Sequence, residues 1–155
     1  MKKLFLASMA TTLLAMAGAA FAGTDTNSIQ VLANVPPVCR ITTAATDVDF
    51  GTYDPTLDAD DTDGTSSVSF RCVKGTTYWT YIARANTMTA GTESLTYELY
   101  TDAARTTVWD ASKTGVGNSS ASNAVQTIDI YGKIPKLQDV GAGSYSESVT
   151  VTVEY

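Results

Sequence analysis

The most telling feature of this 155-residue chain is that it contains no histidine. Histidine is the usual general base near neutral pH, the partner that activates Ser and Cys nucleophiles, and the commonest transition-metal ligand. Its absence argues against triad-type hydrolases and most transition-metal sites. We therefore predict that the chain is not an enzyme and has no catalytic residues, no cofactor and no metal site.

Long apolar runs are also missing, apart from the N-terminal segment. Lys2 and Lys3 precede an uncharged, mostly apolar stretch, and Ala20-Phe21-Ala22 has the small-x-small pattern of a cleavage site. This pattern predicts a signal peptide at residues 1–22 and an exported chain beginning at Gly23. A membrane anchor is disfavoured because the stretch is short and interrupted by polar residues, so we expect no membrane insertion after cleavage.

Positive charge is scarce. Cleavage would remove two of the ten basic residues and leave eight against 16 acidic residues, a formal charge of −8 over 133 residues. Phosphate backbones require a basic face, and anionic lipid requires a polybasic patch. The composition therefore argues against nucleic acid and against anionic membrane surfaces as partners.

Cysteine occurs only twice, as Cys39 and Cys72. An even number in an exported chain predicts one disulfide. The alternative, a two-cysteine metal site, lacks further ligands in a chain without histidine. Closing a loop of this length stabilises a fold by about 3–4 kcal/mol on the chain-entropy account.

Apolar and polar residues alternate with a period of two through most of the exported chain, and no window of eleven residues shows a helical stripe. Such alternation is typical of half-buried strands, and the glycine-rich segments between them are typical of turns. We expect a single all-β domain, a two-sheet sandwich. The expected strands cover residues 67–72, 77–83, 95–100, 125–131 and 149–155.

The N-terminal segment after the cleavage site, residues 23–38, alternates in the same way but is set apart by Pro36-Pro37, which cannot continue a central strand. Its apolar face carries Ile29, Val31, Ala33 and Val35. The last strand, which reaches Tyr155, could leave an open sheet edge. An edge can accept a strand from another chain, which would make residues 23–38 a donor arm. The pattern equally allows them to be the first strand of their own domain.

Two other features suggest chemistry less strongly. The acidic run at residues 58–64 fails as an EF-hand, because Ala59 and Phe70 occupy the positions of the first ligand and the bidentate glutamate. A solvated loop is favoured over an irregular calcium site. The aromatic residues could build a sugar-binding platform, although alternating aromatics are more often core; they are Tyr78, Trp79, Tyr81, Tyr97, Tyr100, Trp109 and Tyr131.

Four strings, in order along the exported chain, resemble the spore coat protein U family. They are Phe50-Gly51-Thr52-Tyr53-Asp54-Pro55, the segment from Tyr97 to Trp109 with its Tyr-Glu-Leu-Tyr-Thr-Asp start, Tyr131-Gly132-Lys133-Ile134-Pro135, and the ending from Gly143 to Tyr155. In the last, Glu147 stands where the family usually has Asp. Each string is weak alone, but four in sequence are specific.

The resemblance implies an incomplete immunoglobulin-like sandwich that lacks its last strand and has an N-terminal donor-strand arm, residues 23–38, before the domain at residues 39–155. The family includes subunits of archaic, Csu-type chaperone–usher pili. By position, Ile29, Val31, Ala33 and Val35 would be the donor side chains, and Val149, Val151 and Val153 would line one wall of the acceptor groove.

The same resemblance implies partners and a location. A periplasmic chaperone would lend the missing strand first, an outer-membrane usher would guide assembly, and neighbouring pilin subunits would then supply the strand. The expected function is a structural pilus subunit at the cell surface, supporting adhesion or biofilm formation. The alternative is a secreted or coat-associated β-sandwich that binds carbohydrate or mediates adhesion.

Overall fold

The structure, a computed structural model, describes residues 22–155; the predicted signal peptide, apart from Ala22, lies outside this range. The described residues form nine strands and no helix. The strands are β1 (Cys39–Thr43), β2 (Thr65–Cys72), β3 (Thr77–Ala83), β4 (Thr87–Ala90), β5 (Glu93–Thr96), β6 (Glu98–Tyr100), β7 (Asn118–Ser119), β8 (Gln126–Lys133) and β9 (Thr150–Glu154). No helix of the described part is long and apolar enough to cross a membrane.

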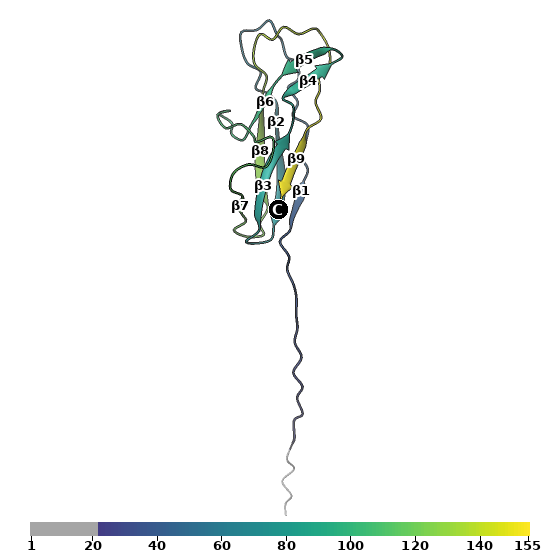
Figure 1. Cartoon of the computed structure of the whole chain (residues 1–155), viewed down its shortest axis with the longest axis vertical. Coiled ribbons are helices and arrows are strands. Elements are labelled where there is room, and N and C mark those ends of the chain that lie inside the picture. The colour runs from purple at the N-terminus through teal and green to yellow at the C-terminus, as the bar shows by residue number, and fades with distance from the viewer. Residues whose placement is uncertain (1–21) are drawn as a thin grey trace, which may run out of the picture. The chain divides into compact units, whose positions relative to one another are not determined.

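The strands form two main antiparallel sheets and one small one (Figure 1). The first sheet has the order β1-β2-β8-β6, the second has the order β7-β3-β9, and β4 and β5 form a two-stranded sheet of their own. The all-β fold with open sheets confirms the expected fold class. The separate β4–β5 hairpin was not expected.

One expected strand, residues 95–100, is divided at Tyr97. The residues before it pair with β4, whereas β6 after it pairs with β8, so the chain changes sheets at this point. The amide of Tyr97 donates instead to the carbonyl of Asn86, at 3.1 Å. The alternation of buried residues nevertheless continues across the break, since Leu95, Tyr97 and Leu99 all point into the core. The pattern therefore identified the buried face but not the change of partner.

The core lies between the two main sheets in two clusters. The larger is built around Ile82, Leu99 and Ile130, all nearly inaccessible to solvent. The smaller contains Phe70 and Tyr78, whose rings meet edge to face at 5.1 Å. Both clusters follow from the period-two alternation, which turns every second residue inward.

The disulfide predicted from the cysteine count joins the first two strands within the smaller cluster. Cys39 and Cys72 are cross-strand partners in the β1–β2 ladder, with their Cα atoms 4.0 Å apart. Both side chains are buried. The bond therefore fixes the start of β1 to the end of β2.

The domain, residues 34–155, has two ends that differ in character (Figure 1). At the base, the chain enters β1 at Cys39, β2 ends and β9 finishes. At the tip lie the β4–β5 hairpin and the loops at residues 51–64 and 134–146. Bridges between Asp61 and Ile134 and between Thr89 and Ser146 hold these tip elements together.

Residues 22–33 form a unit separate from the domain. No residue from 22 to 38 lies in a strand. The apolar side chains of this segment are solvent-exposed, with exposed fractions of 80% for Ile29 and 91% for Val31.

Candidate strand-binding groove

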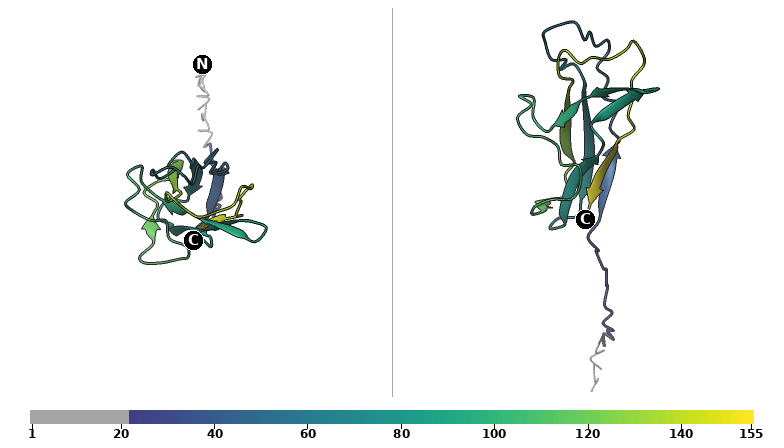
Figure 2. Two further views of the ribbon diagram at one scale, coloured as in Figure 1. Left: turned by 90° about the horizontal axis from the view of Figure 1, so that it is seen from above. Right: turned by 45° about the horizontal axis from the view of Figure 1, so that its top comes forward.

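Two strand edges without a partner lie next to each other on one side of the domain. β1 pairs only with β2, and β9 pairs only with β3, among the described residues. Figures 1 and 2 show β1 and β9 side by side, and the two strands contact each other without joining their sheets. The sandwich is therefore open between them.

The chain segments that continue these edges toward the tip also lack main-chain partners. Residues 44–50, which follow β1, make no backbone–backbone hydrogen bonds, and neither do residues 139–145 or 147–149, which lead into β9. The carbonyl of Thr46 accepts a hydrogen bond from the Ser66 hydroxyl at 2.7 Å, and the hydroxyl groups of the two residues are 3.2 Å apart. Backbone N–H and C=O groups require partners when they are buried, so any chain that covers them must supply those partners.

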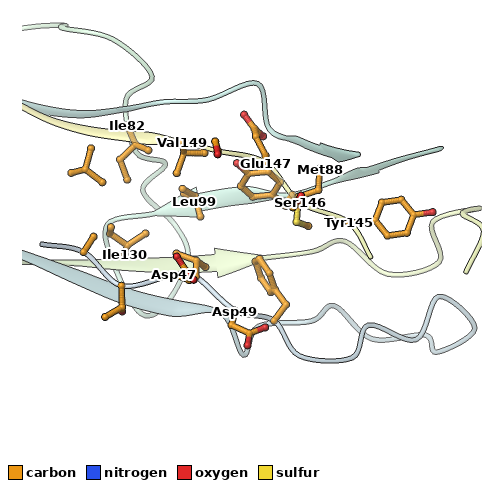
Figure 3. A pocket seen from close by; sticks show the side chains of 17 residues that line it. Asp47, Asp49, Ile82, Met88, Leu99, Ile130, Tyr145, Ser146, Glu147 and Val149 are labelled. Atoms are coloured by element: carbon orange, nitrogen blue, oxygen red, sulfur yellow. The ribbon is translucent and has the colours of Figure 1, made fainter. Parts of the chain in front are cut away.

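Between these segments lie two cavities of about 530 and 550 Å³. They are contiguous, because Val48, Phe50, Met88 and Tyr145 line both. Together they form a groove that runs from β9 to the tip. In the close-up of Figure 3, Asp47 and Asp49 lie on one wall and Val149 and Glu147 lie on the other.

The floor of the groove is the core itself. Ile82, Leu99 and Ile130 line the first cavity, and Leu95 and Ile134 line the second. Figure 3 shows Leu99 and Ile130 between the two walls. An apolar floor flanked by two free main-chain edges is suited to an extended strand with small aliphatic side chains on one face.

The structure places the three predicted acceptor residues along one strand and its approach. Val151 pairs with Ile82 and lines the first cavity, as does Val149, which is 36% exposed. Val153 packs instead on the smaller cluster near the disulfide. Val149 and Val151 are thus brought together at the cavities, and Val153 lies closer to the base.

The sequence reasoning missed the opposite wall. Ile41 is the cross-strand partner of buried Phe70, so it faces inward, yet it remains 50% exposed because no strand covers it. Val48 and Phe50, which line both cavities, alternate with Asp47 and Asp49. This alternation is the signal that could have identified the wall.

The carboxylate of Glu147 connects the segment that leads into β9 to the segment between β3 and β4. Glu147 accepts hydrogen bonds from the backbone amides of Ala85 and Thr87, the latter at 3.0 Å. Burial raises the pKa of Glu147, but these amides, the Tyr97 hydroxyl and the nearby Arg84 guanidinium outweigh it, so the net pKa is below its usual value. Glu147 therefore substitutes for strand pairing where the wall of the groove has none.

A second polar group supports the same region. The Arg84 side chain, 2% exposed, forms an ion pair with Glu98 at 2.7 Å and donates to the carbonyl of Trp109 at 2.7 Å. Burial, and to a lesser extent the hydrogen bond to Glu147, raises the pKa of Tyr97 far above its usual value. This hydroxyl therefore remains protonated and can donate. These hydrogen bonds and this ion pair thus fix the positions of the segments beside the groove.

The predicted donor side chains are accessible. Ile29, Val31, Ala33 and Val35 are all exposed, and so is Leu32 on the other face of the segment.

The aromatic residues do not form an exposed platform. Tyr78, Tyr97 and Trp109 are buried in the core, and the other four are half-buried. Trp79 is covered by Lys113, whose ammonium group lies 3.8 Å from the ring centroid.

The acidic loop carries ion pairs. Asp58 pairs with Lys136 at 2.5 Å and Asp60 with Lys133 at 3.4 Å. Within residues 22–155, no cluster of three or more potential ligands is arranged to hold a metal ion.

Comparison with known proteins decides the family. The family model described as "Spore Coat Protein U domain" matches residues 25–152, which is most of the chain. The chain belongs to the spore coat protein U family. The chain is also 30% identical to Protein U of Myxococcus xanthus over 156 residues, covering 86% of this chain and 87% of that protein.

The fold of this spore coat protein U domain is similar to that of a solved pilus protein. The match is to the crystal structure of the CsuC–CsuE chaperone–tip adhesion subunit pre-assembly complex from archaic chaperone–usher Csu pili of Acinetobacter baumannii. It has a TM-score of 0.51 and 24% identity, and it covers 78% of this chain and 40% of the solved one. The chain thus spans less than half of that protein's length, and the similarity concerns the fold.

Proposed function

We propose that this chain is a structural subunit of a surface pilus of the chaperone–usher type, assembled by donor-strand exchange. The observation that carries the proposal is the groove between β1 and β9, where apolar core is open beneath two unpaired main-chain edges. The occupant is the donor arm, residues 23–38, of another subunit.

The arm has the properties that the groove requires. Its apolar side chains alternate, so all four can face the floor while the polar side chains face outward. Burying four small aliphatic side chains contributes on the order of 6–10 kcal/mol before the costs of association. The main chain of the arm would also pair with the free edges along residues 44–50 and with β9.

Assembly requires a route that protects the groove before the arm arrives. An open core and a free edge make an isolated subunit prone to aggregation. A periplasmic chaperone would occupy the groove first, and an outer-membrane usher would present the subunit for exchange. The similar Csu structure is a chaperone–subunit complex captured before assembly, which supports this order of events.

A head-to-tail contact of this kind propagates rather than closing, and so produces a filament. The chain would be exported through the periplasm and displayed at the cell surface. Adhesion and biofilm formation are the roles that such a fibre would serve.

The test compares the exported chain, residues 23–155, with a form lacking residues 23–35. The full chain should form polymers that survive SDS without boiling and appear as a ladder on gels, whereas the shortened chain should form none. Val31→Asp should reduce the ladder strongly, because it places a charge on the apolar floor. Gln30→Asp, on the polar face of the same arm, is the matched control and should assemble normally.

Normal polymers from the shortened chain would contradict the proposal. So would equal effects of the Val31 and Gln30 substitutions, because inward and outward positions would then be equivalent.

A further inference from the structure

A pair of like charges lies at the base of the domain. Arg40 on β1 and Arg71 on β2 are direct cross-strand partners, next to the disulfide. Both are exposed, on the outer face of the first sheet, because their neighbours Cys39 and Cys72 face inward. Like charges directly opposite each other destabilise a sheet, so this pair is unfavourable within the isolated domain.

No carboxylate of the described domain forms an ion pair with either arginine. Exposed Lys74 in the following turn adds a third cation. The outer face continues toward the tip with the uncharged pair Ser69 and Thr127, and the nearest carboxylate on this face is that of Asp129, opposite Ser67 in the next pair. Arg40, Arg71 and Lys74 therefore form a basic patch at the base of the domain.

The opposite end of the domain has the opposite charge. The tip loop at residues 54–63 contains five aspartates. Lys133 and Lys136 form ion pairs with it and the Arg105 guanidinium donates to the carbonyl of Thr62, so these three cations neutralise only part of the charge. Asp58 remains 78% exposed in its side chain, and Asp63 is exposed. This loop is the acidic tip.

The connection between arm and domain is short. From Val35, the last donor residue, to Cys39, the first residue of β1, there are four residue steps, which span at most about 14 Å. Pro36 and Pro37 stiffen this connection. Once an arm occupies a groove, the base of the donor subunit must therefore lie close to whichever end of the groove the arm entered.

We propose that the basic patch at the base of each subunit docks on the acidic tip of the subunit that receives its arm. This inference rests on the proposed donor-strand function and specifies the contact between consecutive copies of this chain. Entry at the tip places Arg40 and Arg71 near the aspartates at residues 54–63. Entry at the base would bring two basic ends together, so the charges also select the direction of insertion.

The electrostatic contact acts mainly on the rate of assembly. Complementary charges accelerate association by about tenfold or more at low salt, and screening removes most of this effect at high salt. The experiment follows ladder formation by residues 23–155 in about 20 mM and about 500 mM NaCl, between which the Debye length falls from about 20 Å to about 4 Å. The probe variant is R40E/R71E.

The control is a charge-swapped chain, R40E/R71E/D58K/D63K, whose net charge equals that of the original. Neither Asp58 nor Asp63 accepts a backbone hydrogen bond through its carboxylate. We expect R40E/R71E to assemble about tenfold more slowly at low salt and nearly normally at high salt. The swapped chain should recover the original low-salt rate.

The outcomes separate this inference from the proposed function. If the unmodified chain forms its arm-dependent ladder and R40E/R71E matches its rate at both salt concentrations, the docking contact is refuted and donor-strand exchange stands. A slow R40E/R71E that the swap does not rescue also refutes it. If the unmodified chain forms no arm-dependent ladder, both proposals fall.

Discussion

At the scale of single residues, Glu147 shows how one side chain can replace missing strand pairing. Its carboxylate holds the amides of Ala85 and Thr87, and its sequence position coincides with the approach to the unpaired β9 edge. The family resemblance marked this position, but alternation gave it no special role. Only the folded chain brings residues 85 and 87 to it.

The first prediction concerns pH. Because the pKa of Glu147 is lowered in the folded state, its stabilisation is complete above the unfolded value of about 4.3 and is lost as pH falls through the folded value. Glu147→Gln should lower the free energy of unfolding by about 1–2 kcal/mol at pH 7. The difference should shrink in urea titrations below pH 4, whereas Glu93→Gln, on β5, should show no comparable loss at pH 7.

The second residue-scale prediction concerns the disulfide. Replacing both Cys39 and Cys72 by Ser removes a cross-link between residues 33 positions apart and should cost about 3–4 kcal/mol of stability. Denaturant unfolding of the oxidised chain and of the double variant measures this. Equal midpoints would show that the link does not constrain the unfolded chain.

At the scale of elements, the groove depends on how the segment after β1 packs. Phe50 lies over two glycines: a Cβ added to Gly132 would lie 2.4 Å from its ring, and one added to Gly64 would lie 2.8 Å from it. These glycines let the ring settle against the first sheet and leave the groove open. Two residues outside the walls of the groove thus leave the space that the Phe50 ring occupies.

A substitution can therefore narrow the groove without touching the arm. Gly132→Ala should push the Phe50 ring toward the cavities and slow polymer formation by about tenfold, equivalent to about 1.4 kcal/mol. Gly141→Ala is the control at the rim, because its nearest neighbour would be an ordinary 3.7 Å away. Equal ladder rates for both variants would argue against this role for Phe50.

At the scale of the whole molecule, the proposed function requires a domain that is completed only when a strand of another subunit is inserted. Two main sheets share a core, yet they are not joined along the β1 and β9 edges. After strand insertion, many backbone hydrogen bonds and buried side chains would have to be released together. Persistence of the fibre should then depend on a slow unfolding rate rather than on equilibrium stability.

This scale yields a direct prediction. Grafting residues 23–35 through a short flexible linker after Tyr155, while removing them from the N-terminus, should give a monomer whose own groove is filled. Its thermal midpoint should exceed that of the arm-deleted chain by at least about 10 °C, given the burial involved. Calorimetry and size-exclusion chromatography measure both properties; a graft carrying Val31→Asp should lose most of the gain.

Local features of the protein could be predicted from its residues. Alternation located most strands and their buried faces, because side chains in a strand point to opposite sides whatever the strand pairs with. The cysteine count predicted the disulfide, and four motifs indicated the family. Two features emerged only on folding: the unpaired edge of β1 beside that of β9, and the change of sheet at Tyr97. These depend on contacts between segments distant in the chain, which a period of two does not encode.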